Sequence, residues 1–237
     1  MATIHIFLQG KGGVGKSFCS MALAQYLVDS DKTKPICVDA DPVNATFASY
    51  PSFQAEKVEL DPRQFDALVI RLVELPEDAY VVIDNGASTF VPFSRYLLQE
   101  GAADLLLERG HRLVINTVIV GGNALEDTIH GFADLAEQFA EGVGLQIWLN
   151  PFFGPVAYHG KAFWDFPIYQ EHKSKIGAVI QLPELSETFG YDLRVMLEDR
   201  KTFQEAIFGD SYNLMARQRL KMIRDKIYDQ LAQIPEL

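Results

Sequence analysis

Cysteine, basic charge and long apolar stretches are all scarce in this chain of 237 residues. Its two cysteines, Cys19 and Cys37, are too few for a disulfide framework, so we interpret both as small buried side chains in a reducing compartment. No stretch approaches the roughly 18 uninterrupted apolar residues of a membrane-spanning helix, and the first residues lack the basic start of a signal peptide. These absences predict a cytoplasmic protein without stable membrane insertion.

Basic residues are outnumbered, with 21 Lys and Arg against 32 Asp and Glu, which gives a formal net charge of −11. A chain of this charge has no global positive field, so DNA binding would need a local basic patch. The remaining composition, 48% hydrophobic and 22% charged, is that of an ordinary globular protein and excludes a disordered or fibrous one. Because no linker or internal repeat divides the chain, we expect one domain over residues 1–237.

Short apolar stretches alternate with helical patterns along the whole chain. Predicted strands lie at residues 4–8, 35–39, 80–83, 112–120, 145–149 and 176–182. Predicted helices lie at residues 17–28, 124–139 and about 210–232, with a further one that Asp61 caps and Pro62 begins. Strands without polar alternation are buried on both faces. The pattern therefore predicts an α/β fold with a single doubly wound, mostly parallel sheet and helices on both faces.

A glycine-rich segment at residues 10–17 fits the pattern G-x-x-x-x-G-K-S/T, between a predicted strand and a predicted helix. Glycines let successive backbone N–H groups surround phosphate oxygens, and the positive end of the following helix faces the same anion. Lys16 would reach the β- and γ-phosphates, and the Ser17 hydroxyl would ligate Mg²⁺. The predicted nucleotide-binding residues of this segment, together with the residue that follows it, are Gly10, Gly12, Gly13, Val14, Gly15, Lys16, Ser17 and Phe18.

The same segment also satisfies the dinucleotide pattern G-x-G-x-x-G, at Gly10, Gly12 and Gly15. Asp39 lies about where a dinucleotide fold has its ribose-binding acid. A dinucleotide site has no need of Lys and Ser directly after the last glycine, however, and this chain has both. We therefore favour a nucleoside triphosphate.

Acidic residues follow two of the predicted strands. The strand at 80–83 ends in Asp84, the Walker B form, which predicts a ligand for Mg²⁺, directly or through water; the alternative is an ordinary strand-capping aspartate. Asp39 ends the second strand and Asp41 follows it. We assign Asp41 to orienting the attacking water, and Asp39 either to the water shell of the metal or to a structural role.

Lys11, the second residue of the loop, makes it resemble the deviant Walker A box of the ParA/MinD superfamily of ATPases. In that family this lysine reaches phosphates bound by the partner subunit, so the resemblance implies a homodimer formed with ATP and a catalytic role for Lys11 across it. The segment from Asp39 to Pro42 matches the first switch of the family, and Asp84 matches its Walker B acid.

Two later segments resemble the base-binding parts of the same family. Asn150 ends a predicted strand, like the asparagine that reads adenine, and Pro183 lies in a segment similar to the one that contacts the base through its backbone. The resemblance thus implies ATP with Mg²⁺, in preference to GTP.

A narrower resemblance covers nearly the whole chain. Residues 7–17, 41–47, 83–88, 148–151 and 217–221 are similar to the TraL family of conjugal transfer proteins, which are encoded by plasmids with type IV secretion systems. This resemblance implies a slow cytoplasmic ATPase that acts with components of a conjugative DNA-transfer apparatus. Recruitment to the inner membrane would then come through a partner.

Two other functions are compatible with the loop. A partition ATPase would bind DNA non-specifically and needs an exposed basic surface, which the net charge disfavours. A small-molecule kinase or ligase would need a substrate pocket beside the γ-phosphate, and Lys11 disfavours it.

Two segments carry no assigned role. Aromatic side chains gather between residues 152 and 169, where they would dock a partner or, as we favour, fold onto the core. The last predicted helix would bind DNA or lipid or, as we favour, pack with a solvated basic face. Its basic residues are Arg217, Arg219, Lys221, Arg224 and Lys226, against one nearby acid, Asp225.

Overall fold

A computed structural model of the chain describes residues 1–30, 34–58, 62–139, 142–235 and 237. Among these residues, seven strands form one sheet in the order β3-β2-β4-β1-β5-β6-β9, and every neighbouring pair is parallel. The strands are β1 (Thr3–Phe7), β2 (Ile36–Ala40), β3 (Glu56–Lys57), β4 (Tyr80–Asn85), β5 (Arg112–Val120), β6 (Gly144–Asn150) and β9 (Ile176–Gln181).

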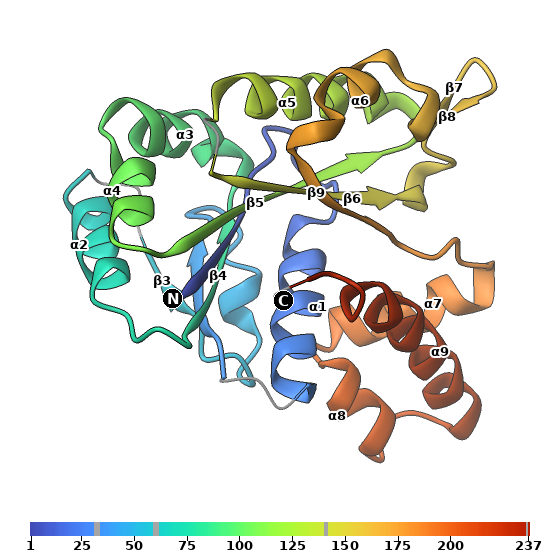
Figure 1. The fold of residues 1–237 in the computed structure, drawn as a ribbon. Helices are drawn as coiled ribbons and strands as arrows, with labels where there is room; N and C mark the ends of the chain where they lie inside the picture. Colours follow the sequence, from blue (N-terminus) through green and yellow to red (C-terminus); the bar gives the residue numbers. More distant parts are fainter. Residues whose placement is uncertain (31–33, 59–61, 140–141, 236) are drawn as a thin grey trace.

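Helices cover both faces of this sheet (Figure 1). One face carries α2 (Pro62–Val73), α3 (Phe90–Gln99), α4 (Ala102–Glu108), α5 (Leu125–Gln138) and α6 (Pro167–His172). The other face carries α1 (Lys16–Asp29), α7 (Glu187–Glu198), α8 (Phe203–Phe208) and α9 (Leu214–Leu231). The predicted doubly wound α/β fold is therefore confirmed.

Each face of the sheet has its own apolar core, because successive side chains of a strand point to opposite faces. In β1, Ile4 and Ile6 belong to the core under α2 to α5, whereas Phe7 belongs to the core under α1 and α9. All three are completely buried. This double burial explains why the strands are apolar without alternation.

The register brings acidic residues of neighbouring strands together at the carboxyl edge of the sheet. Asp84 of β4 pairs with Asp39 of β2 on one side and with Phe7 of β1 on the other. Ligands of open α/β sheets bind in the crevice outside this edge. The glycine-rich loop starts at the same edge, directly after β1.

The segment from 152 to 169 is more ordered than the predicted loop. It contains a hairpin of β7 (Ala157–Tyr158) and β8 (Lys161–Ala162), the short helices η4 (Pro151–Phe153) and η5 (Phe163–Asp165), and the start of α6. Phe163 and Phe166 are buried in the core, as we favoured, but Phe152 and Phe153 remain exposed. The aromatic residues of this segment thus divide between the core and the surface.

The last helix begins four residues later than predicted. Its first residue is Leu214, because the side chain of Asn213 accepts a hydrogen bond from the Ala216 N–H at 2.9 Å and caps the helix. The apolar stripe of Leu220, Ile223, Ile227 and Leu231 is buried, so α9 packs as we favoured. The predicted cap of α2, Asp61, lies outside the described residues.

The basic face of α9 has more acidic partners than Asp225 alone. Arg219 forms a largely buried ion pair with Asp192 of α7, and Arg217 pairs with Asp210 at 3.3 Å. Arg224 pairs with Asp225 itself at 2.7 Å. These contacts correct the expectation of one nearby acid, since two of the three acids were not recognised from the sequence.

Within the described ranges, no helix combines the length and apolarity needed to cross a membrane.

Candidate nucleotide-binding site

The glycine-rich loop connects β1 to α1 through backbone conformations that other residues avoid. Gly13 has a φ of +73° and Gly15 a φ of +96°, both in the left-handed region. A Cβ on Gly15 would also lie 2.8 Å from Asn150 Nδ2. The helix starts at Lys16, so the first N–H groups of α1 face this loop. The loop and the helix together therefore present main-chain donors to an anion.

Lys16 is nearly buried within this loop, with 8% of its surface exposed. Its Nζ donates a hydrogen bond to the carbonyl oxygen of Lys11 at 3.1 Å. Burial lowers the pKa of Lys16, and the carboxylates of Asp84 and Asp41 act in the opposite direction. A cation held this way at a helix N-terminus is suited to bind phosphate oxygens.

Asp84 lies near the end of β4, next to the first turns of α1, and is only 1% exposed. Its Oδ1 accepts a hydrogen bond from the Ser20 hydroxyl at 3.1 Å, and the Ser17 side chain also hydrogen-bonds to it. Burial raises the pKa of Asp84 to about 7, and the nearby Asp39 raises it further, whereas the Ser17 hydrogen bond and Lys16 lower it. The ionised form of this buried carboxyl is unfavourable in free energy, and a bound cation would make it less unfavourable.

Asp39 uses both of its carboxylate oxygens on backbone donors. Oδ1 accepts from the Asp41 N–H at 3.0 Å, and Oδ2 accepts from the Ala48 N–H at 2.8 Å. Burial raises the pKa of Asp39, and these N–H groups lower it. Asp39 thus fixes the course of the segment that carries Asp41, and this structural role leaves its predicted role in the water shell of a metal untested.

Asp41 organises a turn just beyond the sheet edge. Its Oδ1 accepts from the N–H groups of Val43 and Asn44 at 2.9 and 3.2 Å. Gly86, in the segment after Asp84, packs against it so closely that a Cβ there would lie 2.7 Å from Asp41 Cγ. The segments that follow β2 and β4 are therefore in direct contact.

Ser17, Asp39 and Asp84 supply the oxygen donors of the predicted metal site. In the described part of the chain, no group of three or more His, Cys, Asp and Glu residues gathers as a dedicated metal cage. Mg²⁺ is usually held by one or two carboxylates together with substrate phosphates and water, so it does not need such a cage. The donor set therefore fits Mg²⁺ in combination with a phosphate ligand.

Lys11 is the more exposed lysine of the loop, with 46% of its side chain exposed. Its Nζ forms an ion pair with Asp127 Oδ2 of α5 at 2.7 Å. Its backbone N–H donates to Gln9 Oε1 at 3.3 Å, and Gln9 Nε2 donates to the Thr128 carbonyl of the same helix. Gln9 fits against α5 because Gly131 has no side chain there. The loop is thus tied to α5 at two points that the sequence did not indicate.

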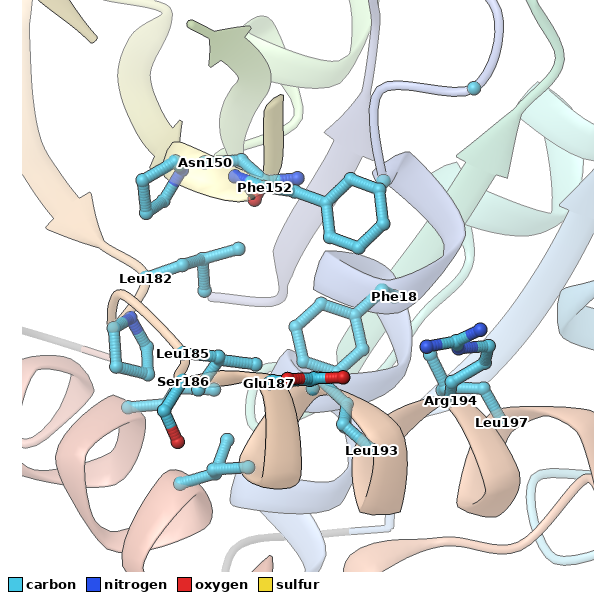
Figure 2. A pocket seen from close by; sticks show the side chains of 17 residues that line it. Phe18, Asn150, Phe152, Leu182, Leu185, Ser186, Glu187, Leu193, Arg194 and Leu197 are labelled. Atoms are coloured by element: carbon cyan, nitrogen blue, oxygen red, sulfur yellow. Dashed lines mark hydrogen bonds between the residues drawn. The ribbon is translucent and has the colours of Figure 1, made fainter. Parts of the chain in front are cut away.

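A cavity of about 420 Å³ opens beside the loop, between the end of β6, the segment after β9, and the helices α7 and α9 (Figure 2). It is lined mainly by apolar side chains, including Leu182 and Leu193. Five of the predicted nucleotide-binding residues line it: Gly13, Gly15, Phe18, Asn150 and Pro183. The structure thus brings together residues that are up to 170 positions apart in the sequence, from 13 to 183. Apolar cavities with a few polar groups are typical of small-molecule sites.

The two cysteines take no part in this site. Cys19 and Cys37 are both buried as free thiols. Burial raises the pKa of Cys37 to about 12 and that of Cys19 well above its ordinary value. Both therefore serve as packing residues.

Comparison with known proteins identifies the class to which this fold and site belong. The family model of the CobQ/CobB/MinD/ParA nucleotide binding domain matches residues 5–224. Two TraL proteins of Escherichia coli are 46% and 44% identical to the chain, each over 238 residues that cover 98% of both sequences. The chain therefore belongs to the CobQ/CobB/MinD/ParA family of nucleotide-binding domains and, within it, to the TraL family.

A solved structure shares the fold at much lower sequence similarity. The MinC:MinD cell division protein complex of Aquifex aeolicus contains a chain with a TM-score of 0.52 and 13% identity. The match covers 99% of this chain and 98% of that one. The likeness extends over the whole sheet and its helices, and it supports the α/β fold.

Proposed function

We propose that the protein is a Mg²⁺-dependent ATPase that works as a dimeric nucleotide switch in conjugative DNA transfer. The observation that carries this proposal is the meeting of three features at one sheet edge: the phosphate loop, the buried carboxyl of Asp84, and the apolar cavity beside Phe18. The membership of the TraL family supports the role in conjugation.

The triphosphate would bind to the main-chain N–H groups of residues 10–18, with Lys16 as its cation. Ser17 and Asp84 would hold Mg²⁺, with Asp39 acting through water, and the bound ion would neutralise charge on the phosphates. Asp41 would orient the attacking water from its turn at the sheet edge. The base would occupy the cavity between Phe18, Asn150 and Pro183.

The contact between Asp41 and Gly86 supports a switch. A ligand shifts a conformational equilibrium only through different contacts in the two states. The γ-phosphate is the group that distinguishes ATP from ADP, and the two segments in contact lie at the edge where it would bind. Hydrolysis would remove its contacts and return both segments to the nucleotide-free arrangement.

Lys11 would act across the dimer, on the phosphates bound by a second copy. In the single chain its ammonium is paired with Asp127 and is half exposed. Pairing of two copies would exchange this contact for one with a phosphate, which is a stronger partner for a cation. A cation supplied by a second protein to a phosphoryl-transfer site increases rates by roughly 10³ to 10⁵ in other systems. Slow hydrolysis by the separate chain follows from this arrangement.

Calorimetric titration of the protein with Mg-ATP tests the nucleotide site. We expect Lys16→Ala to weaken binding by about a hundredfold or more, because it removes a nearly buried cation from the phosphate loop. Lys57→Ala is the matched control, since Lys57 lies exposed on the edge strand β3 and its loss leaves the loop intact. Equal affinities of the wild-type protein and the Lys16 variant would refute the assignment of the loop.

A further inference from the structure

Phe152 is an exposed aromatic residue at the rim of the cavity. Three-quarters of its surface, 75%, is exposed, compared with 52% for the neighbouring Phe153. Phe152 lines the cavity together with Phe18 and Asn150, whereas Phe153 is not among the lining residues. An apolar ring left in water beside a ligand cavity indicates a surface that the ligand covers.

The backbone of Phe152 is held at a fixed position relative to the phosphate loop. A single amide connects them: Asn150 Oδ1 accepts from the Phe152 N–H at 3.1 Å, and Asn150 Nδ2 donates to the Val14 carbonyl at 2.9 Å. Pro151, the first residue of the short helix η4, restricts the backbone between Asn150 and Phe152. Because the loop would determine where the phosphates lie, this connection also determines how far Phe152 is from the rest of a bound nucleotide.

Phe18 provides a second ring on the other side of the cavity. In the view of Figure 2, the rings of Phe152 and Phe18 lie on opposite sides of the open space between them. Each ring is supported by another aromatic side chain. Phe18 packs edge-on against Phe203 with ring centroids 6.3 Å apart, and Phe152 packs edge-on against Phe153 at 4.9 Å. Two supported aromatic rings at one cavity suit a planar aromatic ligand.

We propose that Phe152 stacks on the base of the bound nucleotide and closes the cavity on the solvent side. The proposal rests on the nucleotide-binding function proposed above and adds to it a residue with a defined role. Every base has a π-face, so stacking contributes to affinity without choosing between bases. Asn150 then has two tasks in the free protein, to anchor the loop and to position Phe152, both through its amide group.

The test compares Mg-ATP with Mg-tripolyphosphate, which carries three linked phosphates but neither the ribose nor the base. We expect Phe152→Ala to weaken Mg-ATP binding by roughly fivefold to a hundredfold, as stacking on one base contributes elsewhere. The affinity for Mg-tripolyphosphate is expected to stay at the wild-type value. Phe152→Ala is also expected to weaken the binding of Mg-GTP as much as that of Mg-ATP. Phe152→Tyr, which keeps the ring, is expected to bind both nucleotides and Mg-tripolyphosphate like the wild-type protein.

Phe208→Ala is the matched control, since it removes an exposed phenylalanine ring of α8 that neither lines the cavity nor packs against Phe152. Three outcomes would overturn the proposal: normal binding of Mg-ATP by Phe152→Ala, equal losses for Mg-ATP and Mg-tripolyphosphate, or equal effects of the two alanine variants. Failure of the wild-type protein to bind either ligand would instead refute the proposed nucleotide function, and the stacking role with it. Circular dichroism of each variant checks that it is folded.

Discussion

Asp84 is a residue of the proposed metal site, and its charge state also affects the stability of the fold. It lies almost completely buried at the end of a central strand, next to Asp39 in the adjacent strand. Its pKa is raised from 3.8 to about 7, first of all by burial. Since the folded state holds a proton that the unfolded state releases near pH 4, the fold loses stability as the pH rises from there to about 7.

We therefore expect Asp84→Asn to be more stable than the wild-type protein at pH 8 in buffer without divalent ions. The advantage should shrink by about 2 kcal/mol between pH 8 and pH 5, because a protonated carboxyl and an amide are alike in charge. Urea unfolding at several pH values measures this difference. Asp104→Asn, on the exposed side of α4, is the control that should follow the wild-type pH dependence. Parallel curves for the wild-type protein and Asp84→Asn would contradict the raised pKa.

At the residue scale, the site residues that were best predicted are those that belong to a pattern of neighbouring positions in the sequence. The spacing of the glycines with Lys16 and Ser17 is a local pattern, and in the structure Gly13 and Gly15 have left-handed conformations that other residues avoid. Asp127 and Phe152 were not recognised, because their importance depends on which distant residues they touch. A lone acid in a helix and one phenylalanine among several carry no signal of their own before the fold is known.

At the scale of elements, the contact between the phosphate loop and α5 is the one most directly connected with the proposed switch. Lys11 and Asp127 are both about half exposed, so their ion pair contributes little to the stability of the fold. The side chain of Lys11 lowers the pKa of Asp127 through its hydrogen bond and its charge. The pair can open at small cost when a better partner for Lys11 arrives.

We expect Asp127→Asn to strengthen self-association in the presence of a non-hydrolysable ATP analogue, because Lys11 no longer has a competing partner in its own chain. The dissociation constant of the dimer should fall about two- to fivefold, the range of an exposed ion pair. Sedimentation velocity at several protein concentrations measures it. Glu126→Gln, one position earlier in α5, is the matched control. Weaker association of the Asp127 variant would show that this pair does not restrain Lys11.

Elements were predicted well where the apolar pattern is long, and poorly where it is short. The strand at 112–120 and the helix at 124–139 agree with β5 and α5 to within a residue. The strands β3, β7 and β8 have two residues each, and α6 and α8 have six, which is too short for a period to be recognised. The start of α9 was predicted too early, because Asp210, Ser211 and Asn213 are all good N-cap residues and only the hydrogen bond to Ala216 shows that Asn213 caps the helix.

At the scale of the whole molecule, two apolar cores hold one parallel sheet, and the proposed site lies along the carboxyl edge of that sheet. The alternation of strands and helices predicts a parallel sheet with crossover helices, and strands that are apolar on both faces predict helices on both sides of it. The cavity could not be predicted in the same way. Its wall combines α1 with α7 and α9, which are joined only by tertiary packing.

The net charge of −11 and the pairing of three basic side chains of α9 argue against a partition ATPase that holds random DNA. The apolar lining of the cavity likewise gives little support to a small-molecule kinase, whose second substrate would need polar groups beside the γ-phosphate. A nucleotide switch is therefore the proposed function that agrees best with the net charge, the phosphate loop and the cavity.

The mass of the protein in solution, measured by light scattering with Mg²⁺ and different nucleotides, tests this switch most directly. We expect twice the chain mass of 26.6 kDa with a non-hydrolysable ATP analogue, and a single chain with ADP or with no nucleotide. Lys11→Ala should remain a single chain under all three conditions while still binding the analogue. The same mass with the ATP analogue and with ADP would contradict the central claim that the γ-phosphate controls pairing of two copies.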